Sequence, residues 1–282
     1  MQTLETIARV RQQVSVWRRV GERIAFVPTM GNLHAGHLSL VARAHALADR
    51  VVVSIFINPL QFGQGEDLDA YPRTPLEDTE QLRQAGVDLL FCPQEAEVYP
   101  RGREGLTFVE VPGISDILCG ASRPGHFRGV ATVVAKLFNI VQPDLACFGE
   151  KDYQQLTVLR RMVRDLDFPL EIVVVPTERE PDGLAMSSRN GYLSAEQRRS
   201  APKLYQALQG LAERLRSGDR DWARLEQQAR ERLAVAGLSP DYVSIRRAAD
   251  LALPGETDTE LVILAAAFIG KTRLIDNLLI NL

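Results

Sequence analysis

The chain has 282 residues, of which 45% are hydrophobic and 24% charged, the composition of a globular protein with a core of its own. Its net charge of −3 and a pI of about 5.9 exclude a protein that binds nucleic acid by bulk positive charge. The longest apolar run, 261–269, is too short for the ~20 residues that span a bilayer, and the first residues lack the apolar segment of a signal peptide. We therefore expect a cytoplasmic protein with no nucleic-acid or membrane partner.

From residue 23 to 176, predicted strands alternate with predicted helices. The strands are short apolar runs closed by Pro, Gly or a polar residue, and the helices show apolar residues at helical spacing. The expected strands are 23–28, 50–57, 88–92, 144–148 and 171–175. The expected helices are 4–17, 35–48, 74–85, 129–141 and 152–166. This alternation predicts an α/β fold with a Rossmann-like, doubly wound parallel sheet.

The pattern changes after Pro176. Ser194-Ala-Glu-Gln197 has the form of a capping box and predicts the start of a long helix. A second helix is expected at 221–236, followed by consecutive strands at 242–245, 260–269 and 272–280. Helices followed by neighbouring strands favour a smaller α+β domain with an antiparallel sheet. We therefore expect two domains, 1–176 and 177–282.

The strongest local motif is Met30-Gly-Asn-Leu-His34-Ala-Gly-His37, between the first buried strand and the next helix. His34 and His37 share one face of that helix, and a helix N-terminus favours phosphate. Gly36 lets a nucleotide approach the backbone, and two imidazoles could stabilise charge that develops during α-phosphate transfer. The alternative is two histidines that only begin a helix. Zinc is disfavoured, because no third ligand is apparent.

Two further segments suit a nucleotide. Lys151, in Phe148-Gly-Glu-Lys-Asp-Tyr-Gln-Gln155, stands at a helix N-terminus, where a cation is unfavourable unless an anion binds. Asp152 there is either an N-cap or a ribose ligand, and Gln155 lies one turn further on. Met186-Ser-Ser-Arg189 offers two hydroxyls and a guanidinium, which suit a triphosphate. Its alternative reading is a polar linker between domains.

Uncharged polar side chains indicate where a second substrate binds. Asn58 and Gln61 follow the second buried strand and are suited to orienting a hydroxy acid, although a capped turn explains them equally well. Tyr71 is either a cover for an apolar substrate or a core aromatic. The basic, glycine-containing segment 123–129 is a candidate wall near anionic ligands.

Several common enzyme classes are excluded. The chain has no GxxxxGKS loop, GxGxxG fingerprint or GxSxG elbow, which argues against P-loop kinases, typical nicotinamide dehydrogenases and α/β-hydrolases. Its three cysteines lie far apart, so neither a disulfide framework nor a thiolate zinc site is expected.

Together these residues resemble the pantoate–β-alanine ligase family, and the resemblance covers the whole chain. It is strongest over 28–37, 54–62, 71–73, 125–130, 148–155 and 182–193. HxGH alone would indicate only the wider nucleotidyltransferase superfamily, which resembles class I aminoacyl-tRNA synthetases. Met186–Arg189 looks like the counterpart of their KMSKS loop, with Arg in place of the second Lys.

The resemblance implies an ATP-dependent ligase of coenzyme A biosynthesis that acts as a homodimer. Pantoate would attack the α-phosphate of ATP to give pantoyl adenylate and pyrophosphate, and β-alanine would then displace AMP to give pantothenate. Mg²⁺ is expected with ATP. Its protein ligands are not assigned, and Glu77 and Asp78 are candidates for water-mediated contacts. The alternatives are an adenylyltransferase that acts on a phosphate ester and a non-catalytic nucleotide-binding protein.

The resemblance also implies residue roles. His34, His37, Lys151 and Arg189 would be catalytic, and we expect His37 to act electrostatically rather than as a proton donor. Gln61 and Gln155 would bind pantoate, with Asn58 and Tyr71 completing the substrate site by our reading of the sequence. The ATP-binding residues would be Met30, Gly31, Asn32, Leu33, His34, Ala35, Gly36, His37, Gly149, Glu150, Lys151, Asp152, Glu178, Met186, Ser187, Ser188 and Arg189.

Overall fold

The computed structural model describes residues 1–282, which form two compact units. The first unit comprises residues 1–150 and 158–176, and the second comprises 151–157 and 177–282. The short segment 151–157 therefore groups with the C-terminal residues, although it precedes the last strand of the first unit. The domain boundary at residue 177 stays a prediction.

The first unit contains a six-stranded, wholly parallel sheet with the strand order β1-β4-β3-β2-β5-β6. Its strands are β1 (Gln2–Leu4), β2 (Ile24–Thr29), β3 (Arg50–Ile55), β4 (Leu89–Phe91), β5 (Leu145–Gly149) and β6 (Glu171–Val175). The predicted doubly wound architecture is confirmed. The strands are apolar runs because both faces of the sheet are covered by helices.

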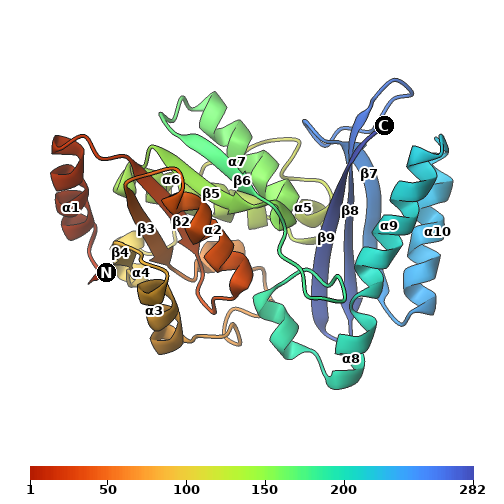
Figure 1. Cartoon of the computed structure of the whole chain (residues 1–282), viewed down its shortest axis with the longest axis horizontal. Helices are drawn as coiled ribbons and strands as arrows, with labels where there is room; N and C mark the ends of the chain where they lie inside the picture. The colour runs from red at the N-terminus through yellow and green to blue at the C-terminus, as the bar shows by residue number, and fades with distance from the viewer. The chain divides into compact units, whose positions relative to one another are not determined.

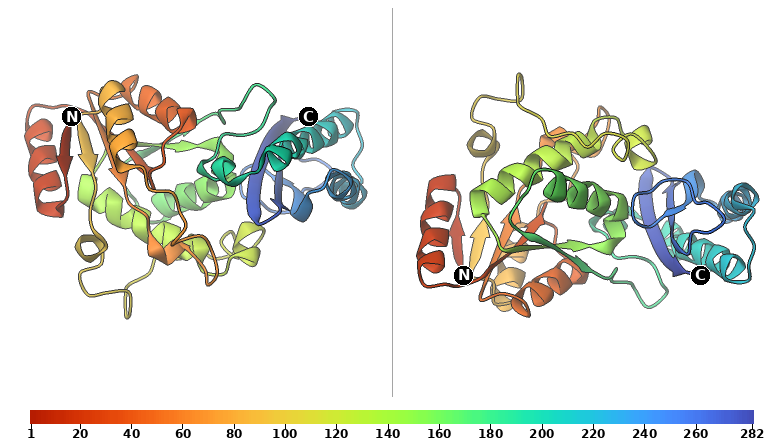
Figure 2. Two further views of the ribbon diagram at one scale, coloured as in Figure 1. Left: turned by 90° about the horizontal axis from the view of Figure 1, so that it is seen from below. Right: turned by 90° about the horizontal axis from the view of Figure 1, so that it is seen from above.

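Helices cover the two faces of this sheet in pairs (Figure 2). On one face lie α2 (Ala35–His45) and α3 (Pro75–Gln84), and on the other lie α6 (His126–Val141) and α7 (Tyr153–Asp165). Successive residues of β2 point to opposite faces of the sheet. Val27 packs in the apolar cluster with residues of α2 and α3, whereas Phe26 packs edge-to-face on Phe138 of α6. The remaining elements are α1 (Ile7–Arg19), η1 (Pro59–Gln61), α4 (Glu95–Val98), α5 (Cys119–Ser122) and η2 (Glu150–Asp152).

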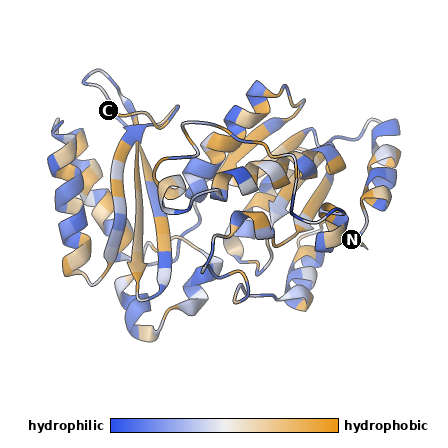
Figure 3. Ribbon diagram, turned by 180° about the vertical axis from the view of Figure 1, so that it is seen from behind, coloured by the Kyte–Doolittle hydropathy of each residue, from blue (hydrophilic) through white to orange (hydrophobic).

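The second unit is built on a three-stranded antiparallel sheet in the order β7-β8-β9. Apolar residues of α9 and α10 form one buried cluster with this sheet, and Figure 3 shows the strands largely hydrophobic and these two helices mixed. The elements are η3 (Ser188–Tyr192), α8 (Ala195–Ser200), α9 (Lys203–Arg216), α10 (Trp222–Val235), β7 (Ser239–Arg247), β8 (Glu260–Ile269) and β9 (Thr272–Asn281). The predicted α+β fold is confirmed.

Several predicted bounds differ from the structure by a few residues: for example, β7 starts three residues before the predicted strand at 242–245, and α2 ends three residues before the predicted end at 48. The predicted helix at 4–17 begins only at Ile7, because residues 2–4 pair with β4 as an edge strand. Ser194 does form a capping box with Gln197, but the helix ends at Ser200 and a new one starts after Pro202. Proline lacks the N–H that would continue the first helix. The helix predicted from Gly129 starts three residues earlier, at His126.

No helix of the structure is both long enough and apolar enough to cross a membrane. The three cysteines are free, and Cys119 and Cys147 are buried. Burial raises the pKa of the Cys147 thiol to about 11, so this thiol stays protonated at neutral pH and packs as a small apolar side chain.

We predict that Phe138→Ala lowers the free energy of unfolding by about 3–5 kcal/mol, as measured by urea denaturation. Phe138 is buried and its ring lies edge-to-face against Phe26, Phe148 and Phe168. Leu166→Ala, at an exposed position after α7, is the control and should change stability by less than about 0.5 kcal/mol. Equal effects of the two substitutions would contradict this assignment of the core.

Candidate active site

The order of the strands places a ligand site at the ends of β2 and β5. Strand order reverses at β2, because β3 and β4 lie on one side of it and β5 and β6 on the other. Ligands of doubly wound sheets bind outside the carboxyl ends of the strands at such a reversal. Phe26 of β2 pairs with Ala146 of β5, and both strands end three residues later, at Thr29 and Gly149. The turn that carries the two histidines therefore begins at this edge.

A buried carboxylate shapes the turn after β2. Gly31 and Asn32 both have positive φ, at 81° and 51°, so the chain reverses sharply there. The amides of Asn32 and Leu33 donate to the two oxygens of Asp78, each at 2.8 Å, and Thr74 Oγ1 donates to the same carboxylate at 3.1 Å. Asp78 is 2% exposed. Burying a charge is costly unless hydrogen bonds compensate, so this side chain holds the turn.

This arrangement changes the role foreseen for Asp78. Its two oxygens already accept three hydrogen bonds from protein groups, which fits a positioning residue better than a water-mediated magnesium contact. The neighbouring Glu77 is exposed. No group of three or more His, Cys, Asp or Glu side chains in the structure could hold a metal ion.

His34 and His37 form a reciprocal cap at the start of α2. His34 Nδ1 accepts from the amide of Gly36 at 3.2 Å, and His37 Nδ1 accepts from the amide of His34 at 3.3 Å. A ring nitrogen that accepts a hydrogen bond carries no proton, so each neutral ring holds its proton on Nε2. The ring centroids are 4.1 Å apart. The motif thus presents two neighbouring Nε2–H donors.

Asn58 positions Gln61 after β3. Asn58 is 1% exposed; its Nδ2 donates to Gln61 Oε1 and Gly129 O, and its Oδ1 accepts from Tyr99 and from the amide of Leu60. These bonds use its whole hydrogen-bonding capacity. Asn58 therefore holds Gln61 in place instead of presenting a group to a ligand.

Gln61 itself has a weakly held donor. Its Nε2 donates to Met30 Sδ at 3.0 Å, and a thioether is a weak acceptor. The close packing of α6 fixes the backbone of η1, because a Cβ on Gly129 would lie 2.2 Å from Leu60 O. The Gln61 side chain is therefore held by rigid neighbours, and it can still exchange its contact with Met30 for a ligand.

The neighbouring aromatic and basic residues are more engaged than the sequence suggested. Tyr71 is buried and packs edge-to-face on Phe62. Arg123 forms two hydrogen bonds with the Glu66 carboxylate and one with Gln61 O. Burial is the largest single influence and would raise the pKa of Glu66, but the hydrogen bonds and charge of Arg123, with smaller contributions from Gly63 and His126, together lower the pKa. Arg123 is thus neutralised by Glu66, whereas Arg128 of the same segment is exposed and lies over the ring of Phe108.

The second unit holds the predicted ATP-binding residues from Lys151 onward, whereas Gly149 and Glu150 belong to the first unit. Lys151 Nζ lies 3.7 Å from Asp152 Oδ2 in the turn before α7, and Gln155 is half-buried one turn further on. The segment 178–186 folds back on itself, with an isolated bridge between Arg179 and Ala185 and a bond from Met186 N to Glu178 O. Ser187 then caps η3 by accepting from Arg189 N at 3.2 Å.

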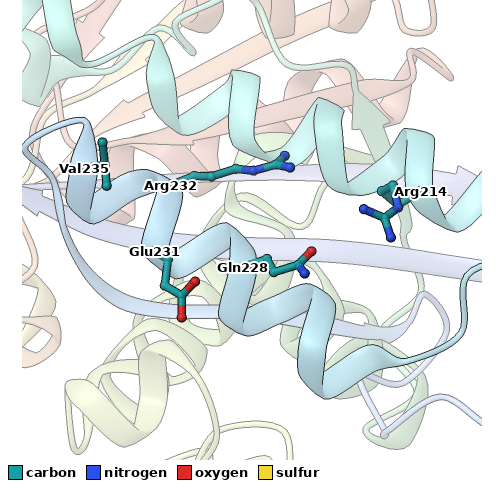
Figure 4. A pocket seen from close by; sticks show the side chains of 5 residues that line it. All are labelled: Arg214, Gln228, Glu231, Arg232 and Val235. Carbon is teal, nitrogen blue, oxygen red and sulfur yellow. The ribbon is translucent and has the colours of Figure 1, made fainter.

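A surface pocket of about 430 Å³ lies elsewhere in the second unit, between α9 and α10 (Figure 4). It is lined by Arg214, Gln228, Glu231, Arg232 and Val235. None of these residues belongs to a motif, and Arg214 is paired with Asp219. We assign the pocket no part in the reaction.

The comparisons with known proteins identify the family of this chain. Residues 2–279 match the family model described as pantoate-beta-alanine ligase. The chain belongs to the pantoate–β-alanine ligase family. A pantothenate synthetase of Thioalkalivibrio sulfidiphilus is 62% identical over 100% of this chain and 99% of its own length.

Solved structures lead to the same family. The crystal structure of pantothenate synthetase from Thermus thermophilus is 49% identical, covers 99% of both chains and gives a TM-score of 0.92. A Francisella tularensis pantoate–β-alanine ligase, complexed with β-γ ATP and β-alanine, is 36% identical over 99% of this chain and 97% of its own, with a TM-score of 0.84.

The family assignment establishes the reaction. The chain is an AMP-forming carbon–nitrogen ligase that condenses pantoate with β-alanine at the expense of ATP, through pantoyl adenylate. This decides against the adenylyltransferase and the non-catalytic protein that the sequence left open.

Asp78 tests how the histidine turn is held. Asp78→Asn replaces one acceptor oxygen by a donor, so one buried amide loses its partner. We expect the free energy of unfolding to fall by about 1–3 kcal/mol and ATP–pyrophosphate exchange to slow. Asp165→Asn, the same substitution at the exposed end of α7, should leave the exchange rate unchanged and stability within about 0.5 kcal/mol of the parent. An Asp78→Asn enzyme with the stability and exchange rate of the parent would show that the carboxylate does not hold the turn.

Proposed function

We propose that ATP binds at the histidine turn, with its phosphates against the Nε2–H groups of His34 and His37. The observation that carries this proposal is the reciprocal cap, which uses both Nδ1 atoms and leaves the proton of each ring on Nε2. Neutral imidazoles in this tautomer are hydrogen-bond donors for phosphoryl oxygens. Backbone of the same turn, including Gly31 and Gly36, would approach the nucleotide closely.

Pantoate would bind at Gln61. Its Nε2 can exchange the weak Met30 thioether for a pantoate oxygen, while Asn58 holds the other end of the amide. Gln155 is the second proposed pantoate ligand. The buried Tyr71 packs on Phe62, so its ring would offer the substrate a fixed apolar surface.

The other ATP-binding roles follow from the motifs of the family. We propose that Lys151 and Arg189 carry charge to the phosphates and that Asp152 contacts the ribose. Glu178 would act through its backbone, which makes its exposed side chain unimportant. The remaining proposed contacts are Met30, Asn32, Leu33, Ala35, Gly149, Glu150, Met186, Ser187 and Ser188.

Family likeness supports three further proposals: Mg²⁺ accompanies ATP, the enzyme is a homodimer, and it works in the cytoplasm. Mg²⁺ would neutralise part of the phosphate charge. The protein offers no cluster of three ligands for it, so the phosphates themselves would supply most of its coordination.

The chemistry needs charge stabilisation more than proton transfer in its first step. A carboxylate oxygen of pantoate forms a bond to the α-phosphorus, and the bond to pyrophosphate breaks. His34 and His37 donate hydrogen bonds to oxygens whose negative charge is redistributed in this step. The amine of β-alanine then attacks the acyl carbon, loses a proton and displaces AMP. A site closed to water would protect the mixed anhydride between the steps.

ATP–pyrophosphate exchange tests this order of events. The purified enzyme should catalyse exchange with Mg²⁺ and pantoate and without β-alanine, and should release AMP only after β-alanine is added. Exchange that is absent without the amine would contradict a free-standing adenylation step.

The role of His37 predicts a kinetic defect without a folding defect. His37→Ala should slow pyrophosphate exchange by about 10²–10³-fold, the usual loss when one such donor is removed. His45→Ala, at the exposed end of the same helix, is the matched control. Exchange within a factor of two of the parent in His37→Ala would remove this residue from the chemical step.

The role of Gln61 predicts a defect that is selective for one substrate. Gln61→Ala should raise KM for pantoate about tenfold and leave KM for ATP nearly unchanged, because one hydrogen-bonding group is lost. Gln64→Ala, in the exposed loop that follows, should behave like the parent. Unchanged saturation by pantoate in Gln61→Ala would place the acid elsewhere.

A further inference from the structure

Two consecutive buried residues of β9, Asp276 and Asn277, contact both ATP-binding segments of the second unit. Each is 4% exposed. Asp276 binds the segment that leads to Ser187–Arg189, and Asn277 binds the backbone of Lys151. In the sequence these two segments are separated by strand β6 and the residues around it.

The contact with the 177–189 segment is made through Arg179. Its guanidinium forms a two-pronged ion pair with Asp276, at 2.7 and 2.9 Å, and also donates to Gly183 O at 3.1 Å. Its charged group lies 3.6 Å from the ring centroid of Tyr205 on α9. A planar guanidinium can satisfy a carboxylate and stack on an aromatic ring together, which an ammonium cannot.

Tyr205 also fixes the turn of this segment. Gly183 has φ of 92°, and a Cβ there would lie 2.9 Å from Tyr205 Cδ1. The backbone turn at Gly183 therefore rests on the ring that carries Arg179. An isolated β-bridge pairs Arg179 with Ala185, the residue directly before Met186. Figure 1 shows this segment running beside β9.

The contact with Lys151 is a single hydrogen bond. Asn277 Nδ2 donates to Lys151 O at 2.8 Å, and the backbone N–H of Asn277 donates to Asp276 Oδ1 at 2.8 Å. Asp276 therefore orients two residues, Arg179 and its neighbour Asn277. The Asp276 carboxylate is thus bonded directly to Arg179 and is connected to the Lys151 segment through Asn277.

We propose that Asp276 and Asn277 are positioning residues for ATP, which set Lys151 and the Ser187–Arg189 segment at a fixed spacing on one rigid strand. This inference rests on the proposed ATP-binding roles of Lys151, Ser187, Ser188 and Arg189. Phosphate-binding groups on turns gain precision when buried neighbours lock their backbone. The Arg179 ion pair is satisfied on both sides, so it costs little to bury in this place.

The test separates positioning from simple stability by comparing KM with kcat. Asn277→Asp keeps the shape of the side chain and replaces the donor to Lys151 O by an acceptor. We expect KM for ATP to rise about three- to tenfold, with KM for pantoate unchanged. Arg179→Lys, which keeps the charge and loses the fork, should shift KM for ATP in the same direction.

The matched control is Asn281→Asp, the same substitution at an exposed position of β9, which should leave both KM values unchanged. A lower kcat with both KM values unchanged in Asn277→Asp and Arg179→Lys would mean loss of folded enzyme only, and would overturn the proposal.

A third variant, Lys151→Ala, distinguishes failure of this inference from failure of the proposed ATP site. Lys151→Ala should raise KM for ATP more than Asn277→Asp does. A normal KM for ATP in Lys151→Ala would mean that the proposed ATP-binding role of Lys151 is wrong. An impaired Lys151→Ala beside a normal Asn277→Asp would overturn the positioning role alone.

Discussion

The hydrogen bonds from the amides of Asn32 and Leu33 to the Asp78 carboxylate are the constraint on which the histidine turn depends. The positive φ of the non-glycine residue Asn32 is unfavourable, and a buried charge is unfavourable as well. Each compensates the other here, because the turn directs two amides at one carboxylate. The turn then leads His34 into the cap of α2. That cap sets the tautomer of both rings, so the donor chemistry depends on a contact that neither histidine makes.

Most of the fold could be predicted because both sheets have strong local patterns. Buried parallel strands are continuous apolar runs, and β8 and β9 were predicted nearly to their ends. The errors are at places where distant contacts or a proline decide. Strand β1 has only three residues and exists because β4 offers it an edge. Pro202 divides a segment whose capping box had indicated one long helix.

The site could be predicted less completely. The motifs after β2 and β5 were found because doubly wound sheets place ligands at the ends of such strands. The residues that hold the motifs were either not named, as with Asn277, or named for another role, as with Asp78, since their partners lie far away in sequence. Asp78 is 46 residues from Asn32, and Asn277 is 126 residues from Lys151. One signal was available: Asp78 shares a helix face with the buried Leu82, which marks it as an acid directed into the core.

The tautomers of His34 and His37 test the central claim most directly. The chain has four histidines, so side-chain ¹⁵N spectra at pH 8 contain four rings, which His45→Gln and single variants of the others can assign. The account predicts that His34 and His37 are both neutral with the proton on Nε2 and an unprotonated Nδ1. A proton on Nδ1 of either ring would contradict the cap and, with it, the assignment of these residues as phosphate donors.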